Sequence, residues 1–185
     1  MKQALLVIDA QQELMDGNKE YEGVYQKEQL INTINEVIEQ ASEQKVDILF
    51  VRDVDVSSGE GPGFLVHEKI NVPDGSPVFD KKATNAFHGT GLLDHLRENE
   101  IGHLVIMGCQ TEYCIDTAVR TATVQGFDVT LVKEGHSTTN SNVLNAEQII
   151  AHHNKTLHGH NNVDHFSMVR SSKEDLFSPT HDTYR

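Results

Sequence analysis

Cysteines and basic side chains are scarce in this sequence, and each scarcity excludes a class of protein. The two cysteines, Cys109 and Cys114, flank a short turn and make a poor disulfide framework for a secreted chain of 185 residues. We therefore expect reduced thiols and a cytoplasmic protein. With 15 basic residues against 28 acidic ones, the formal charge is −13, which argues against nucleic acid and anionic membranes as partners. A small molecule or another protein is the expected partner.

The sequence also lacks a long hydrophobic run. The first apolar run, Ala4–Ile8, is too short for a signal peptide core and far too short for a membrane span. We therefore expect no targeting segment and no membrane partner. A length of 185 residues fits one ordinary domain, so we expect a single domain over residues 1–185. Its polar tail, from about residue 171, is expected to be loosely ordered or to pack on a partner subunit.

Short apolar runs alternate with helical patterns along the chain. The predicted strands are residues 4–8, 46–51, 77–80, 104–107, 128–133 and 166–169, and the predicted helices are residues 28–44, 91–99, 114–125 and 146–157. Continuous apolar runs are typical of strands that are buried on both faces. The alternation predicts an α/β fold with three layers (α/β/α) and a six-stranded parallel sheet. Residues 54–75, rich in glycine, are predicted to form a long loop of the kind that covers binding sites.

Polar residues follow three of these predicted strands. Right-handed crossovers place the carboxyl ends of parallel strands on one rim, so Asp9, the pair Lys81 and Lys82, and Cys114 are expected to meet there. A thiolate can attack a carbonyl carbon, and a carboxylate can take the thiol proton and return it to a leaving amine. The backbone N–H groups of Gln110 and Cys114 are candidates for an oxyanion hole.

The predicted position of Cys114 on the first turn of a helix bears on its reactivity. Unpaired N–H groups and the positive end of the helix dipole are expected to lower the pKa of a thiol there. The alternative is that a cysteine on an apolar helix is only a small buried hydrophobic residue. Cys109, which directly follows the glycine at the end of a strand, fits this alternative better than Cys114 does.

Three spaced motifs resemble the isochorismatase-like cysteine hydrolase family, which includes nicotinamidase-related amidohydrolases. They occupy residues 5–11, 81–92 and 107–118, in the family's order, and the similarity extends along nearly the whole chain. The resemblance implies a Rossmann-like six-stranded sheet and a catalytic triad of Asp9, Lys81 and Cys114. It also implies a cis peptide bond between Cys109 and Gln110, before the oxyanion-hole amide, and a dimer or tetramer.

The family's spacing between lysine and phenylalanine selects Lys81, counted back from Phe87, while Lys82 remains the alternative. The resemblance makes Phe87 a candidate at the mouth of the substrate pocket, and its alternative is an ordinary core aromatic. Leu14 and Tyr113 are further pocket candidates with the same alternative.

The sequence contains 11 histidines, which are densest between residues 152 and 160. No His-Glu-x-x-His arrangement is present, so a structural or surface role is favoured and no metal or other cofactor is expected. Nicotinamidases in the family hold a metal with an Asp-x-His motif after the second strand, where this chain has Arg52-Asp53-Val54-Asp55. True isochorismatases lack the cysteine nucleophile, so Cys114 argues against that reaction.

These residues together predict an amidohydrolase that cleaves the C–N bond of a small amide through a thioester on Cys114. The alternative function is a non-catalytic, oligomeric family member whose reactive thiol senses oxidation.

Overall fold

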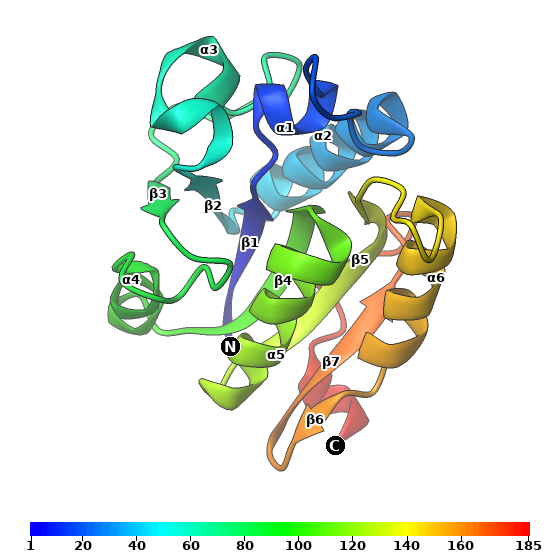
Figure 1. The fold of residues 1–185 in the computed structure, drawn as a ribbon. Coiled ribbons are helices and arrows are strands. Elements are labelled where there is room, and N and C mark those ends of the chain that lie inside the picture. Colours follow the sequence, from blue (N-terminus) through cyan, green and yellow to red (C-terminus); the bar gives the residue numbers. More distant parts are fainter.

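Strand β1 (Lys2–Ile8) lies in the middle of the sheet because both of its faces are apolar. Ala4, Leu6 and Ile8 pack into one hydrophobic cluster, while Leu5 and Val7 pack into the other. This alternation is the two-residue period of a strand that is buried on both sides. The computed structural model describes residues 1–185 and arranges them as helices around one sheet (Figure 1).

The sheet has seven strands in the order β3-β2-β1-β4-β5-β7-β6. The strands are β1, β2 (Asp47–Asp53), β3 (Val78–Lys81), β4 (Ile101–Cys109), β5 (Asp128–Ser137), β6 (Asn161–Asn162) and β7 (His165–Arg170). All neighbours pair in parallel except β6, which is antiparallel to β7. The prediction of six strands was therefore one short, because β6 consists of two asparagines and carries no apolar signal.

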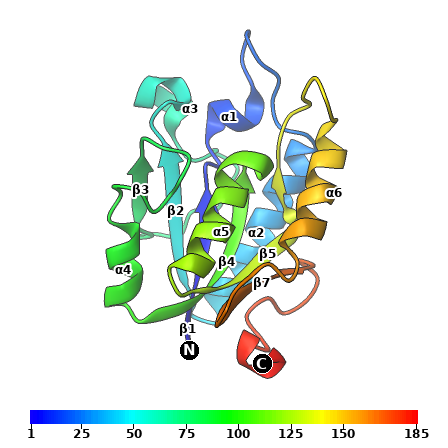
Figure 2. The same cartoon turned by 60° about the horizontal axis from the view of Figure 1, so that its bottom comes forward.

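Helices cover both faces of the sheet, so the α/β/α layering is confirmed (Figure 2). The α-helices are α1 (Gln12–Asp16), α2 (Lys27–Glu43), α3 (Gly61–Phe64), α4 (Leu92–Glu98), α5 (Asp116–Val124) and α6 (Ala146–Leu157). Helix α2 packs its apolar side on one face, and α4, α5 and α6 pack theirs on the other. No helix combines the length and the apolar character that crossing a bilayer requires.

Two predicted segments differ from the structure in ways that matter for the site. The helix predicted from residue 114 is preceded by a π-helical turn, η2 (Thr111–Ile115), so Cys114 lies in that turn and α5 begins after it. The loop predicted for residues 54–75 contains the short 3-10 helix η1 (Val56–Gly59) and helix α3. Short helices such as these carry too few residues for a periodic apolar pattern.

The C-terminal tail packs on the chain's own sheet. Leu176 and Phe177 are buried in the cluster beneath α2. In the last helix, the 3-10 segment η3 (His181–Tyr184), His181 Nε2 donates a hydrogen bond of 2.9 Å to the Val129 carbonyl. The Arg185 guanidinium pairs with the buried carboxylate of Asp128 at 2.6 Å. The tail thus completes the hydrophobic core of the chain itself.

We predict that Phe177→Ala destabilises the protein by about 3 kcal/mol, because it removes a ring that is only 2% exposed and leaves a cavity. The measurement is the free energy of unfolding from urea denaturation. Thr183→Ala, at an exposed position of the same tail, is the matched control and should leave that free energy within about 0.5 kcal/mol of the wild-type value. Equal unfolding midpoints for the two variants would show that the tail does not belong to the core.

Candidate active site

Four polar side chains converge where the strands end at one rim of the sheet. Asp9 directly follows β1, Asp53 is the last residue of β2, and Lys81 is the last residue of β3. Asp53 and Lys81 are direct partners in the parallel register of β2 and β3. Cys114 reaches the same place from the π-helical turn that follows β4. Asp9, Lys81 and Cys114 therefore lie together at one rim of the sheet, as the sequence predicts.

The Lys81 ammonium joins these groups. Its side chain is fully buried, and Nζ lies 2.9 Å from Asp9 Oδ2. Nζ also donates hydrogen bonds to Asp53 Oδ2 and, over 3.4 Å, to Cys114 Sγ. Burial by itself would lower the pKa of Lys81, but Asp9, Cys114 and Asp53 together raise it above its usual value. The ammonium is therefore charged at neutral pH. Lys82, the alternative lysine, is exposed and makes no ion pair.

Asp53 is the member of this group that the sequence analysis missed as a site residue. Its backbone is clamped by Gln11, which accepts from the Asp53 N–H at 2.7 Å and donates to the Asp53 carbonyl at 3.0 Å. A signal was available in the sequence, because Asp53 follows an apolar strand run in the same way that Asp9 does. Only the pairing of β2 with β3 shows that its carboxylate meets Lys81.

Asp9 is placed to act as a base. Burial raises its pKa to about 6, although Lys81 and the hydrogen bond with Cys114 oppose that rise. Oδ2 pairs with Lys81, whereas no N–H or O–H group of the protein donates a hydrogen bond to the buried Oδ1. An ionised carboxylate with a free oxygen beside a thiol can accept the proton of that thiol.

The pKa of Cys114 differs from the expectation based on a helix start. Burial raises it to about 12, the Asp9 carboxylate adds to that rise, and Lys81 opposes it. The expectation of a lowered pKa was wrong, because the thiol is only 9% exposed and a carboxylate lies beside it. These two effects on the pKa of Cys114 outweigh the effect of the helix dipole. The resting thiol is therefore neutral.

The turn before Cys114 supplies a candidate oxyanion hole. The peptide bond between Cys109 and Gln110 is cis. The Gln110 carbonyl accepts from the N–H groups of Tyr113 and Ile115, each at 3.2 Å, while the Gln110 N–H donates to no acceptor of the protein. A fixed and unused N–H donor is the kind of group that stabilises a developing oxyanion.

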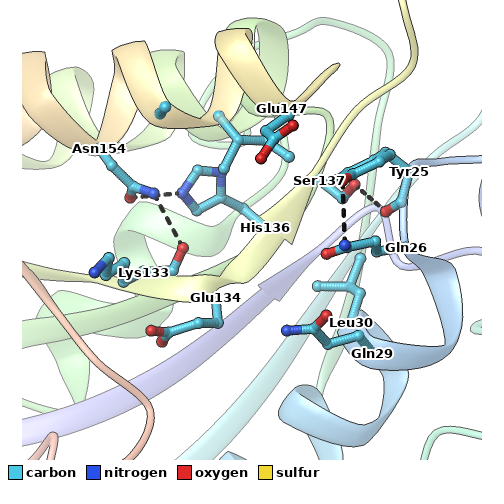
Figure 3. A pocket seen from close by; sticks show the side chains of 12 residues that line it. Tyr25, Gln26, Gln29, Leu30, Lys133, Glu134, His136, Ser137, Glu147 and Asn154 are labelled. Atoms are coloured by element: carbon cyan, nitrogen blue, oxygen red, sulfur yellow. Dashed lines mark hydrogen bonds between the residues drawn. The ribbon is translucent and has the colours of Figure 1, made fainter. Parts of the chain in front are cut away.

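His136 on β5 anchors this turn from behind. Asn154 donates to the Lys133 carbonyl at 3.1 Å, so its Oδ1 faces His136 and accepts from Nε2 at 3.0 Å (Figure 3). His136 Nδ1 is then an acceptor for the Thr111 hydroxyl at 2.9 Å. Burial lowers the pKa of His136 to about 4, which keeps the ring neutral and able to accept. A cavity of about 360 Å³ between α2 and α6 lies on the other side of His136, remote from the thiol.

The three predicted pocket residues lie in different surroundings. Leu14 lines a groove of about 400 Å³ together with Gln110, Tyr21, Glu22, Thr139 and Asn140. Tyr113 is 56% exposed beside the thiol. Phe87 is buried in the same apolar cluster as Cys114 and stacks on Phe127 at 6.4 Å between ring centroids. Leu14 and Tyr113 therefore border open space at the rim, while Phe87 supports the thiol from the core.

Asp9, Asp53 and Cys114 bring their ligand atoms within 4.8 Å of one another, which is close enough to surround a metal ion. The Lys81 ammonium, however, already contacts all three groups. A divalent cation beside a buried ammonium is unfavourable, and no histidine joins the set. The residues present therefore do not fit a metal site. In the segment rich in histidine, His153 Nδ1 donates to the Ile149 carbonyl at 2.8 Å, which is a structural contact.

Comparisons with known proteins identify the family and the fold of the chain. The family model of the isochorismatase domain matches residues 3–152. The chain is 27% identical over 135 residues to the uncharacterized isochorismatase family protein YrdC of Bacillus subtilis, covering 72% of each chain. A solved isochorismatase family protein superposes with a TM-score of 0.81 and 28% identity, over 91% of this chain and 98% of that one. N-carbamoylsarcosine amidase from Thermoplasma acidophilum shares the fold, with a TM-score of 0.73 and 20% identity over 94% and 98% of the two chains.

We predict that iodoacetamide alkylates Cys114 faster than Cys109. Burial raises the pKa of both thiols, but Cys109 has no exposed surface at all whereas Cys114 is partly accessible. Because the thiolate is the reactive form, the rate at Cys114 should still be rising between pH 8 and pH 10. Peptide mass spectrometry after timed labelling measures both rates. Equal labelling of the two cysteines would contradict the placement of Cys114 at an accessible site.

Proposed function

The chain belongs to the isochorismatase family of hydrolases, and we propose that it is a cysteine hydrolase that cleaves the C–N bond of a small amide. The observation that carries this proposal is the contact of one buried ammonium with Asp9 and Cys114 beside the unused N–H of Gln110. Nucleophile, base and oxyanion donor are the three parts that acyl transfer needs. The single domain, the cytoplasmic location and the dimer or tetramer stay predictions.

The first half of the reaction transfers the acyl group to sulfur. Asp9 takes the proton from Cys114 Sγ while the sulfur attacks the amide carbon, and Lys81 stabilises the negative charge on sulfur. Because the pKa values of Asp9 and Cys114 are about 6 and about 12, the proton moves only as the new bond forms. The carbonyl oxygen takes the negative charge and is held by the N–H groups of Gln110 and Cys114.

The second half releases both products. Protonated Asp9 gives its proton to the amide nitrogen, and the C–N bond breaks. Ammonia or an amine departs, and the acyl group remains on Cys114 as a thioester. Asp9 then deprotonates a water molecule, which attacks the thioester through the same oxyanion hole. The carboxylic acid leaves, and the proton returns from Asp9 to the thiol. Atoms and charge balance without a cofactor.

The groove lined by Leu14 and Gln110 supports a small substrate. Its volume of about 400 Å³ is within the range of pockets for small molecules. Tyr113 offers an exposed ring at the same rim. We place Leu14 and Tyr113 at the substrate pocket on this basis, and Phe87 behind the thiol.

The surroundings of Cys114 favour the hydrolase over the oxidation sensor. Sensor thiols combine solvent exposure with a lowered pKa, since the thiolate is the form that peroxide oxidises. Cys114 is about nine-tenths buried, and burial raises its pKa to about 12. A neutral thiol of this kind needs a neighbouring base that accepts its proton as the sulfur attacks. Asp9 is that base.

We predict that Cys114→Ala abolishes ammonia or amine release from any substrate found in a panel of small amides and acyl ureas. The variant lacks the sulfur that forms the thioester, so residual turnover should fall at least about a thousandfold. Intact mass spectrometry of the wild-type protein should detect the acyl adduct during turnover. Cys109→Ala is the matched control and should retain release. Unchanged turnover in Cys114→Ala would eliminate the proposed nucleophile.

The pH dependence of kcat/KM provides a second test. Asp9 must be ionised to accept the thiol proton, and burial raises its pKa to about 6. Activity should therefore rise with pH through this value and be about tenfold lower at pH 5 than at pH 7.5, because about a tenth of the carboxyl groups are ionised one unit below the pKa. Asp9→Asn should lose this limb together with most of the activity. If the activity of Asp9→Asn still falls at low pH in the same way, a group other than Asp9 causes the pH dependence.

A further inference from the structure

Lys81 has no hydrogen-bond donor left for a substrate. A lysine ammonium carries three N–H groups and no acceptor. The three groups meet Asp9 Oδ2, Asp53 Oδ2 and Cys114 Sγ, all of which belong to the protein. Asp53 accepts the third N–H of the ammonium, which neither Asp9 nor the thiol accepts. Without the carboxylate of Asp53, this N–H would have no acceptor among these groups.

Asp53 is held so that its carboxylate cannot turn away from Lys81. Its other oxygen, Oδ1, accepts from the Asp55 N–H at 2.9 Å. Its backbone is clamped on both sides by the amide of Gln11, which is fully buried. The same amide also donates to the Phe64 carbonyl at 2.9 Å, which ties it to helix α3. Such a set of fixed contacts is typical of a residue with a positioning role.

The charges at the centre do not cancel. With Asp9 and Asp53 ionised, Lys81 charged and the thiol neutral, the sum of the formal charges is −1. Proton transfer from Cys114 to Asp9 leaves this sum unchanged. The thiol lies beside Asp9, Asp53 and Lys81, which come from the ends of β1, β2 and β3, and the neutral thiol of Cys109 at the end of β4 is also close to it.

The basic residues that adjoin Asp53 and Lys81 in the sequence do not belong to the buried centre. The Arg52 guanidinium pairs with both carboxylate oxygens of Asp80, at 2.8 and 3.0 Å. Lys82 is exposed to solvent, away from the buried centre. The groove beside Gln110 adds one more acidic group, Glu22, and no basic one. A substrate carboxylate would therefore find no buried basic side chain that is free to pair with it.

We propose that Asp53 is a positioning and specificity-determining residue, which occupies Lys81 and thereby restricts the site to acyl groups that are uncharged or cationic near the reacting carbonyl. This inference rests on the proposed function, and it deepens that function by naming the charge class of the substrate. An anionic acyl group meets a net negative charge in a site with little water, where charges act strongly on one another. Uncharged amides and amides with a nearby amino group do not meet this repulsion.

The test uses iodoacetamide and iodoacetate, two thiol reagents of nearly the same shape that differ in one negative charge. The quantity measured is the ratio of their alkylation rates at Cys114, divided by the same ratio for a small free thiol. In the wild-type protein this normalised ratio should favour iodoacetamide by about tenfold or more, as expected for one charge repelled at short range.

Asp53→Asn keeps the shape of the side chain, removes its charge and frees a donor of Lys81. The normalised ratio should fall by about tenfold in this variant, and the midpoint of alkylation with pH should move to lower pH, since the thiolate forms more easily. Asp55→Asn removes an exposed carboxylate two positions away and is the matched control, with no change expected. Asp53→Glu retains the charge and should retain the preference for iodoacetamide.

The two proposals fail in different ways. A normalised ratio near one in the wild-type protein, or an equal ratio in folded Asp53→Asn and Asp55→Asn, overturns the role of Asp53. If Asp53→Asn does not fold, the wild-type ratio and Asp53→Glu decide the question. Alkylation needs no amide substrate, so a protein with the expected ratios and no hydrolysis of any amide would retain the effect of Asp53 on the charge preference at Cys114 and lose the proposed function.

Discussion

The buried ammonium of Lys81 is the interaction on which the rest of the site depends. Its side chain is fully buried, and a charge in that position is tolerated only when it is paired and hydrogen-bonded. The three acceptors come from the ends of β1 and β2 and from the turn after β4, while Lys81 itself ends β3. Four segments that are distant in sequence must therefore meet in one arrangement, which makes the geometry of the site part of the stability of the fold.

The same burial sets the chemistry of the two acidic partners in the reaction. It raises the pKa of Asp9 to about 6 and that of Cys114 to about 12, so the resting site holds a carboxylate and a neutral thiol. In this state the Cys114 thiol still carries the proton that is later transferred to the leaving amine. A free thiolate would be a stronger nucleophile, but it would have lost that proton to solvent. The arrangement suits amide cleavage, in which the nitrogen must be protonated before it can leave.

Much of this site was predictable from the sequence, and the exceptions have physical reasons. Apolar runs located β1 and β4, and the polar residues after them placed Asp9 and Cys114 on one rim. Asp53 follows an apolar run as Asp9 does, but its contact with Lys81 depends on the pairing of β2 with β3, which sequence patterns do not contain. The pKa of Cys114 was predicted in the wrong direction, since the dipole argument omitted burial and the neighbouring carboxylate. The π-helical turn was not predicted, because one turn of π-helix does not have the apolar period of 3.6 residues that indicates an α-helix.

The position of the site follows from the order of the strands. The chain builds β2 and β3 on one side of β1, and β4, β5 and β7 on the other, so the order of the strands reverses between β1 and β4. Ligands of open α/β sheets bind at the carboxyl ends of the strands at such a point. Gly108 lies opposite Ile8 at this point, with φ +126, and a Cβ there would approach the Ile8 carbonyl oxygen to 1.9 Å. Only glycine allows the two strands to come this close just before they separate. The base after β1 and the nucleophile after β4 are therefore brought together by the backbone, before any side-chain interaction holds them.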